Sequence, residues 1–216
     1  MNGFRPPRTI ETGSLTLRPF VAADAGALLN TMFGDATLTT WLSVRRHRSM
    51  LDSLRYIHDK EIAWLAGTEY SWALVERTSG ALVAAIDLRA SPPRAEIGVI
   101  VSARATPRQR RAGLAALLKL LRWLLSQPQL YRIEAHCAPE SAATSTMQKL
   151  GFTLEGRLTN WLSLPNATQQ VGDALLFSIC RPIGQEEQSG ALPKDAAAAS
   201  RAGPRILAAR VERLTR

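Results

Sequence analysis

The chain has 216 residues, of which 46% are hydrophobic and 21% charged, and it carries a net charge of +9. This composition excludes an intrinsically disordered chain, and the length fits one domain with tails. The two cysteines, Cys137 and Cys180, form no CxxC pair and the three histidines form no HExxH motif, so we expect neither a disulfide scaffold nor a metal site.

Residues 1–13 are predicted to form a flexible N-terminal arm. Periodicity, capping and turn signals then predict, in chain order, a strand at Ser14–Arg18, helices at Ala22–Met32 and Ser49–Leu65, strands at Ser71–Glu76, Ala81–Leu88 and Ala95–Val101, a helix at Gly113–Ser126, a strand at Tyr131–Cys137, a helix at Ser141–Leu150, and strands at Arg157–Ser163 and Asp173–Cys180. Residues 183–216 have the basic, low-complexity composition of a disordered tail.

The order of these elements predicts an α/β (α+β) domain over residues 14–182. A strand–helix–strand–helix unit behind a meander of strands indicates a mixed, mostly antiparallel seven-stranded sheet with helices on both faces. The N-terminus lacks the apolar region of a secretory signal, and no apolar run is long enough to span a bilayer. We therefore expect a cytoplasmic protein without a membrane partner.

The positive charge has two explanations. An arginine-rich composition accounts for it without any function, whereas an anionic partner such as nucleic acid, a phosphorylated cofactor or the ribosome surface would make use of it. Local clustering separates these explanations better than the total does. The clusters are Arg104, Arg108, Arg110 and Arg111, and Arg45, Arg46 and Arg48.

The most informative segment is a strand that feeds an arginine-rich loop and then a helix. The first backbone N–H groups of a helix lack internal partners and lie at the positive end of its dipole, so they suit a diphosphate. Gly113 and Ala115 are small enough for a phosphate to approach the backbone closely. The segment is neither a Walker A loop nor a GxGxxG fingerprint.

Arg110, Gly113 and Ala115 fit the [Q/R]xxGx[G/A] signature of the GNAT superfamily of N-acetyltransferases. The flanking sequences AEIGVIV and YRIEAHCAPESAATSTMQKLGFTLEGRL, together with the opening GSLTLRPFVAADAGALL, resemble its RimJ/RimL-like branch. The resemblance runs from about Ser14 to Pro182.

This resemblance implies a fold that splays two central strands apart, with acetyl-CoA as co-substrate in the gap. The amine substrate would enter from the opposite side and attack the thioester directly, without an acyl-enzyme. The pantetheine arm would pair with backbone near Ile100, Val101 and Ser102. The phosphates would lie on the amides of the loop, with flanking arginines adding charge, and the site as a whole would include Arg108, Arg110, Arg111, Ala112, Gly113, Leu114, Ala115 and Glu140.

Direct aminolysis needs a base, and the candidates are carboxylates on two strands. Glu96 lies on the strand where relatives hold a carboxylate that acts through water; the alternative is a salt-bridged strand residue. Glu134 and His136 share a strand face, either as a base with a coupled imidazole or as a structurally bonded pair.

The usual acid of the family is missing or displaced. Glu140 stands where an Asn is usual, Ala143 where this branch usually has Ser, and Met147 where other members have Tyr. Ser141 takes the place of the Asn if the start of the helix shifts, and it completes the set of catalytic candidates.

The leading hypothesis is an acetyl-CoA-dependent N-acetyltransferase that acts on a primary amine. The acceptor would be a protein N-terminus, as of a ribosomal protein, or a small amine or antibiotic; a basic enzyme is drawn to the ribosome and repelled by aminoglycosides. The alternative is a non-catalytic acyl-CoA-binding or RNA-contacting module. A homodimer is compatible with the sequence.

Overall fold

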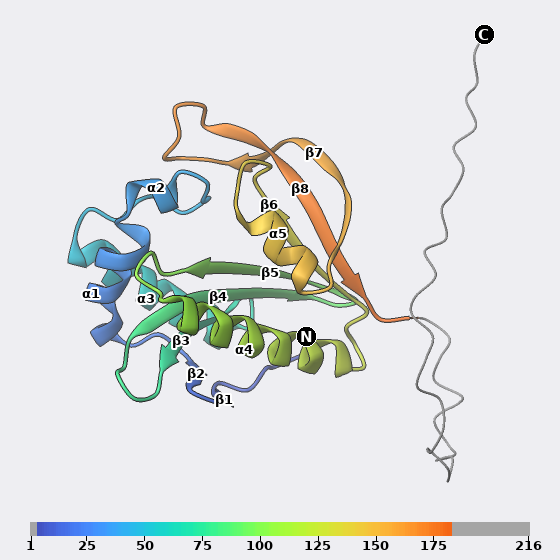
Figure 1. The fold of residues 1–216 in the computed structure, drawn as a ribbon, viewed down its shortest axis with the longest axis horizontal. Coiled ribbons are helices and arrows are strands. Elements are labelled where there is room, and N and C mark those ends of the chain that lie inside the picture. The colour runs from blue at the N-terminus through green and yellow to red at the C-terminus, as the bar shows by residue number, and fades with distance from the viewer. Residues whose placement is uncertain (1–3, 183–216) are drawn as a thin grey trace. The chain divides into compact units, whose positions relative to one another are not determined.

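A mixed sheet of eight strands runs through the structure, a computed structural model that describes residues 4–182 (Figure 1). Its strands follow the order β1-β2-β3-β4-β5-β6-β8-β7. Their bounds are β1 Ile10–Thr12, β2 Leu15–Arg18, β3 Tyr70–Glu76, β4 Leu82–Ser91, β5 Arg94–Val101, β6 Arg132–Cys137, β7 Thr153–Ser163 and β8 Val171–Cys180. Only β5 and β6 run parallel, because a helix carries the chain back between them.

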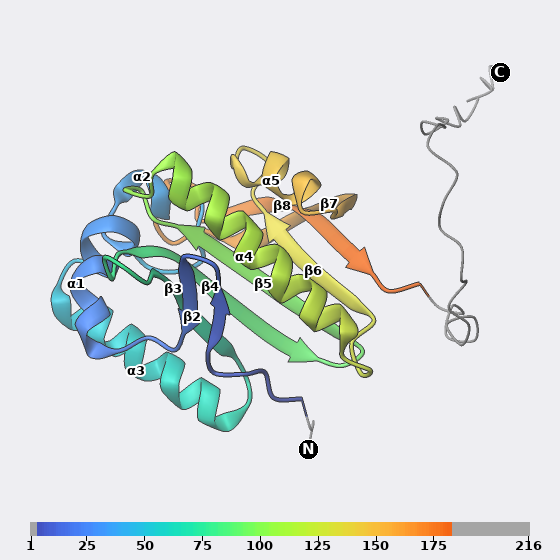
Figure 2. The same ribbon diagram turned by 60° about the horizontal axis from the view of Figure 1, so that its bottom comes forward.

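Helices cover both faces of this sheet. Their bounds are η1 Ala22–Asp24, α1 Ala25–Leu28, η2 Leu29–Phe33, α2 Ala36–Thr39, α3 Met50–Ala66, α4 Pro107–Ser126 and α5 Ala143–Lys149. One buried cluster joins α4 and α5 to one face of the strands, and a second joins α1, η2 and α3 to the other (Figure 2). Leu74 faces the first cluster and its neighbours Ala73 and Val75 the second, as the alternation of β3 requires. Within residues 4–182, none of the helices combines the length and the apolar content needed to cross a membrane.

The seven predicted strands correspond to β2 through β8, and β1 is an additional strand at the edge. Residues 4–13 are therefore packed against the sheet instead of forming the flexible arm that we expected. Phe4 is buried and its carbonyl accepts a hydrogen bond of 2.7 Å from Tyr70 Oη, while Trp72 Nε1 donates to Pro7 O at 3.2 Å. Residues 1–3 and the predicted tail at 183–216 lie outside the described residues.

Helix α4 begins at Pro107, six residues before the predicted start at Gly113. Thr106 caps it: its hydroxyl accepts from the N–H of Gln109 at 3.2 Å, and the Gln109 side chain accepts from the N–H of Thr106 at 2.9 Å. From sequence alone, Pro107 and its neighbouring arginines were predicted to form a loop. Proline is, however, well suited to the first position of a helix, since its missing N–H would have no partner there.

The parallel pair of β5 and β6 is short, and this shortness creates the site. Only three residues of each strand are paired, Arg94 to Glu96 of β5 with Arg132 to Glu134 of β6. Beyond Glu96 and Glu134 the two strands separate, with β5 continuing to Val101 and β6 to Cys137. The splayed central strands that the resemblance implied are thus present.

Candidate functional site

A cavity of about 260 Å³ lies on the α4 side of the sheet, next to the separated part of β5. Its floor is apolar and comes from β3, β4, β5 and the inner side of α4. The residues that line it are Leu74, Val83, Ala84, Ile86, Val99, Val101, Arg110, Arg111, Gly113, Leu114, Leu117, Thr146 and Lys149. An apolar channel of this kind suits an acyl chain or a flexible linker better than a polar metabolite.

Cationic side chains border this cavity from two helices. Arg111 on α4 and Lys149 on α5 are exposed, and neither makes an ion pair or a side-chain hydrogen bond with any residue between 4 and 182. Arg110 is engaged locally, since its Nε donates to Ala105 O at 3.0 Å and its Nη2 to Ser102 O at 3.4 Å. The positive charge that remains free for a ligand therefore belongs to Arg111 and Lys149.

The start of α4 offers few free amides. Pro107 has no N–H, Gln109 donates to the Thr106 hydroxyl, and the N–H of Arg110 donates to Thr106 O at 2.9 Å. The amides expected to hold a diphosphate, from Arg110 to Ala115, belong to the regular helix and not to its start. The difference arises because the helix starts earlier than predicted. Within its first turn, only the N–H of Arg108 has no hydrogen-bond partner among residues 4–182.

The other predicted cofactor residues fall in several environments. Val101 lines the cavity, whereas Ile100 packs on the opposite face with the α1 and α3 cluster. Ser102 is buried, and its N–H donates to Val83 O at 2.9 Å. Ala112, Gly113 and Leu114 are partly buried on the inner side of α4, while Arg108 and Ala115 are exposed. Glu140 is exposed in the turn before α5.

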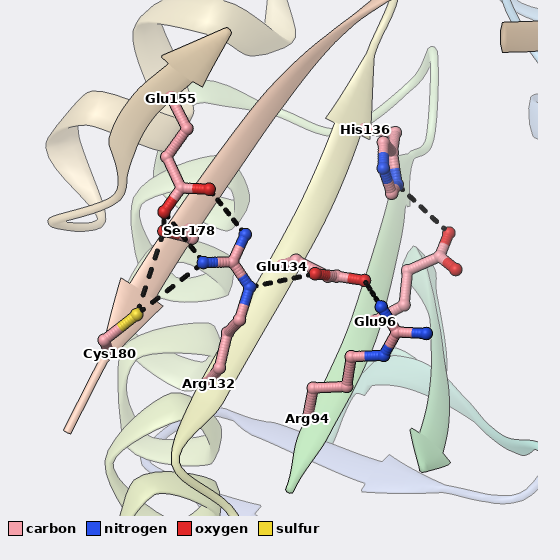
Figure 3. A network of polar contacts seen from close by, with 8 residues as sticks. All are labelled: Arg94, Glu96, Arg132, Glu134, His136, Glu155, Ser178 and Cys180. Carbon is pink, nitrogen blue, oxygen red and sulfur yellow. Dashed lines mark hydrogen bonds and ion pairs between the residues drawn. The ribbon is translucent and has the colours of Figure 1, made fainter. Parts of the chain in front are cut away.

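The candidate catalytic carboxylates, Glu96 and Glu134, and the neighbouring His136 lie on the face of the sheet opposite the cavity (Figure 3). Glu96 of β5 and His136 of β6 flank the point where the strands separate, with 3.6 Å between Glu96 Oε1 and His136 Nδ1. That distance is an ion-pair distance and exceeds that of a hydrogen bond. The His136 imidazole is the main cause that lowers the pKa of Glu96, and nearby Arg89 adds to the effect.

Glu134 is held between two arginines. Its carboxylate receives Arg132 Nε at 3.0 Å and lies 3.9 Å from Arg94 Nη1. Arg132 in turn makes a two-pronged pair with Glu155, at 2.7 and 2.6 Å, which lowers the pKa of Glu155 to about 2. Since both arginines contact the Glu134 carboxylate, it is less free than Glu96 or His136 to contact an incoming amine.

His136 is almost enclosed, with 10% of its side chain exposed. Its Nδ1 is shielded from solvent and has no hydrogen-bond partner, while Nε2 makes no hydrogen bond with a described residue and is not shielded. The ring of Trp161 from β7 stacks on the imidazole, with centroids 5.3 Å apart and 27° between the planes. Trp161 was not among the predicted site residues. The one signal that pointed to it is an aromatic residue on a strand whose neighbours are mostly polar.

Two further residues can be assigned local roles. The Ser141 hydroxyl accepts from the N–H of Ala143 at 3.2 Å, so it caps the turn that opens α5. Cys137 is buried among apolar side chains, which raises the pKa of its thiol to about 11 and keeps it protonated. Among residues 4–182 there is no group of His, Cys, Asp and Glu side chains that could hold a metal ion.

The comparisons with known proteins agree with this geometry. The family model described as "Acetyltransferase (GNAT) domain" matches residues 14–153. No curated protein shows significant sequence similarity to the chain.

Among solved structures, a putative ribosomal-protein-serine acetyltransferase from Vibrio cholerae is 19% identical with a TM-score of 0.67, covering 82% of this chain and 100% of its own. RimJ from Mycobacterium smegmatis in complex with CoA-disulfide is 21% identical with a TM-score of 0.66, covering 80% and 85%. The Microcin C7 self immunity acetyltransferase MccE, in complex with acetyl-CoA and AMP, is 17% identical with a TM-score of 0.70, covering 82% and 98%.

Proposed function

This chain belongs to the GNAT acetyltransferase family, and we propose that it moves the acetyl group of acetyl-CoA onto the N-terminal amine of a protein. The observation that supports this best is the split between β5 and β6. An apolar cavity with a cationic border lies on one face of the split, and a carboxylate beside an imidazole lies on the other. The two halves of an acyl transfer, thioester and amine, would meet at this opening.

On the cavity side, the pantetheine arm would extend along β5. The edge of β5 from Ile97 to Val101 has no paired residues on β6, so its backbone groups can pair with an extended amide-containing chain. The acetyl thioester would then reach the split, where Glu96 marks the last paired position of β5.

The phosphates of the co-substrate would be held by side chains. Because the first turn of α4 satisfies its own amides, Arg111 and Lys149 offer the free donors at the border of the cavity. Arginine and lysine both form charge-assisted hydrogen bonds with phosphate oxygens. This assignment keeps Arg111 among the cofactor-binding residues and adds Lys149.

On the other side, the acceptor would enter as an ammonium group and meet the carboxylate of Glu96, which is more exposed than that of Glu134. An acceptor on the ribosome is supported by the net charge of +9 and by the similar structure from Vibrio cholerae, a putative ribosomal-protein-serine acetyltransferase. A small amine is the competing acceptor.

The test of the cofactor assignment is calorimetric titration of acetyl-CoA into the wild type, into the double variant Arg111→Ala/Lys149→Ala, and into Arg108→Ala as the matched control. Loss of about 1.4 kcal/mol for each exposed cation predicts about 100-fold weaker binding by the double variant. Arg108 lies outside the cavity border, so its loss should change the affinity less than threefold. Equal losses in both variants would mean that the first turn of α4 carries the phosphates.

The test of the activity is release of CoA thiol on a panel of peptides with free N-termini and of small amines. Turnover of peptides alone supports a protein acceptor, and turnover of small amines alone contradicts it. Binding of acetyl-CoA without turnover on either part of the panel favours a non-catalytic acyl-CoA-binding module.

A further inference from the structure

Among the histidines of residues 4–182, only His136 has a ring nitrogen that is shielded from solvent and lacks a hydrogen-bond partner. Its position follows from the topology: β6 pairs with β5 only as far as Glu134, so His136 is the first residue of its strand face beyond the split. On the other side β6 pairs with β8, where His136 lies opposite the apolar Leu176. The imidazole therefore lies beside the point where β5 and β6 separate.

The charged groups around this ring come from three strands. Glu96 on β5 faces Nδ1 at 3.6 Å, and it also lies 3.5 Å from Arg89 on β4. On β6 itself, Glu134 shares the strand face but is engaged by Arg132. β7 supplies the uncharged ring of Trp161. Glu96 is thus the charged group closest to the imidazole.

We infer that His136 is a catalytic residue which accepts the proton of the acceptor ammonium at Nε2, and that Glu96 is the residue that positions it. The inference rests on the proposed acetyl transfer. We assign the hydrogen of the neutral ring to Nδ1, because the Glu96 carboxylate lies 3.6 Å from that nitrogen, and this tautomer leaves the lone pair on Nε2. This arrangement is that of a base oriented by a third group.

The proposed step balances as follows. The ammonium proton passes to Nε2, which gives an imidazolium and a neutral amine. The amine lone pair forms a bond to the thioester carbonyl carbon, and the carbon–sulfur bond breaks with its electron pair on sulfur. The second nitrogen proton passes to this thiolate, so that the products are an amide and CoA thiol, and the imidazolium returns its proton to solvent.

Glu96 is less suited to this role because His136 and Arg89 both stabilise its carboxylate form and lower its pKa. A carboxylate with a lowered pKa accepts a proton from an ammonium only weakly, whereas a good general base has a pKa near the working pH. His136 is therefore the proton acceptor of the pair, and Glu96 is the group that faces its ring.

The test compares His136→Gln, Glu96→Gln and the control His58→Gln, in which an exposed histidine of α3 is lost. The readout is the pH profile of kcat/KM on the best peptide of the panel. We expect His136→Gln to lower kcat by about 10²–10⁴-fold with KM for acetyl-CoA unchanged, and to remove the acid limb of the profile. Glu96→Gln should keep the acid limb and lower kcat less than His136→Gln does, because the accepting nitrogen is retained and only its positioning partner is lost. His58→Gln should match the wild type.

The opposite pattern overturns the inference: an acid limb that survives in His136→Gln and disappears in Glu96→Gln would assign proton acceptance to Glu96. Calorimetric titration of acetyl-CoA into both variants provides a readout without turnover. Both should bind acetyl-CoA as the wild type does, and a matching loss of binding would contradict a role in proton transfer. If both bind as expected but the wild type acetylates nothing on the panel, the proposed function fails, and the catalytic role of His136 fails with it.

Discussion

Replacing Gly113 separates the two ways of placing the phosphate-binding segment. Gly113 lies within α4, and a Cβ added there would be 3.5 Å from Leu74 Cδ2 and 3.8 Å from Val83 Cγ1, which are ordinary contacts. Glycine inside a helix costs about 0.8–1.0 kcal/mol relative to alanine. Gly113→Ala should therefore raise the free energy of unfolding by about 1 kcal/mol, or Tm by about 2–4 °C.

Gly113→Leu should act on binding instead. Leucine has a helix propensity close to that of alanine, so the fold should be retained. Its larger side chain would, however, occupy the cavity beside Leu74 and Val83. We expect acetyl-CoA affinity to fall by more than about 100-fold, which corresponds to about 2.7 kcal/mol. Thermal melting and calorimetric titration of both variants give the two numbers.

Two results would refute this reasoning. A loss of stability in Gly113→Ala would mean that residue 113 is not inside a regular helix. Wild-type affinity in a folded Gly113→Leu would mean that the cavity does not take the acyl arm.

Two further predictions concern contacts away from the cavity. Arg132 lowers the pKa of Glu155 to about 2. The ion pair therefore contributes its full stability above the ordinary glutamate pKa of about 4.3, and this contribution is lost as the pH falls toward 2. The difference in Tm between the wild type and Glu155→Gln should shrink over that interval, and a constant difference would contradict the pairing. The Asn166 amide donates to Thr39 O and Val44 O at 2.9 and 2.7 Å and accepts from the N–H of Arg46 at 2.8 Å. Asn166→Asp loses both donors, and at about 1 kcal/mol for each bond it should lower the free energy of unfolding by about 2 kcal/mol in urea titration; stability equal to the wild type would show that the two loops hold without this residue.

The sequence predicted the sheet well because its strands carry strong periodic signals. β2 through β8 were all expected within a few residues, since alternation of apolar and polar residues is local information. The first strand was missed because β1 has only three residues, Ile10–Thr12, and follows Pro6 and Pro7. What holds residues 4–13 in place is long-range, namely the contacts of Phe4 and Pro7 with Tyr70 and Trp72, and a local pattern cannot reveal such contacts.

Only the part of the candidate site that depends on local spacing could be predicted from the sequence. The shared face of Glu134 and His136 follows from spacing on one strand, and the structure has both on one side of the sheet. The approach of Glu96 to His136 depends on the register of a parallel pair, and a sequence does not contain that register. Trp161 comes from the far edge strand, so its stacking on His136 was equally beyond local reasoning.

The capping box at Thr106 and Gln109 connects the error about α4 with the chemistry of the site. A helix start binds phosphate because its first N–H groups lack partners. Here a proline removes one of these groups and the Thr106 hydroxyl satisfies another, so the first turn is well capped and correspondingly poor as an anion site. If this GNAT domain binds acetyl-CoA as we propose, the positive charge for the phosphates would come from elsewhere, and the exposed cations at the border of the cavity, Arg111 and Lys149, are placed to supply it.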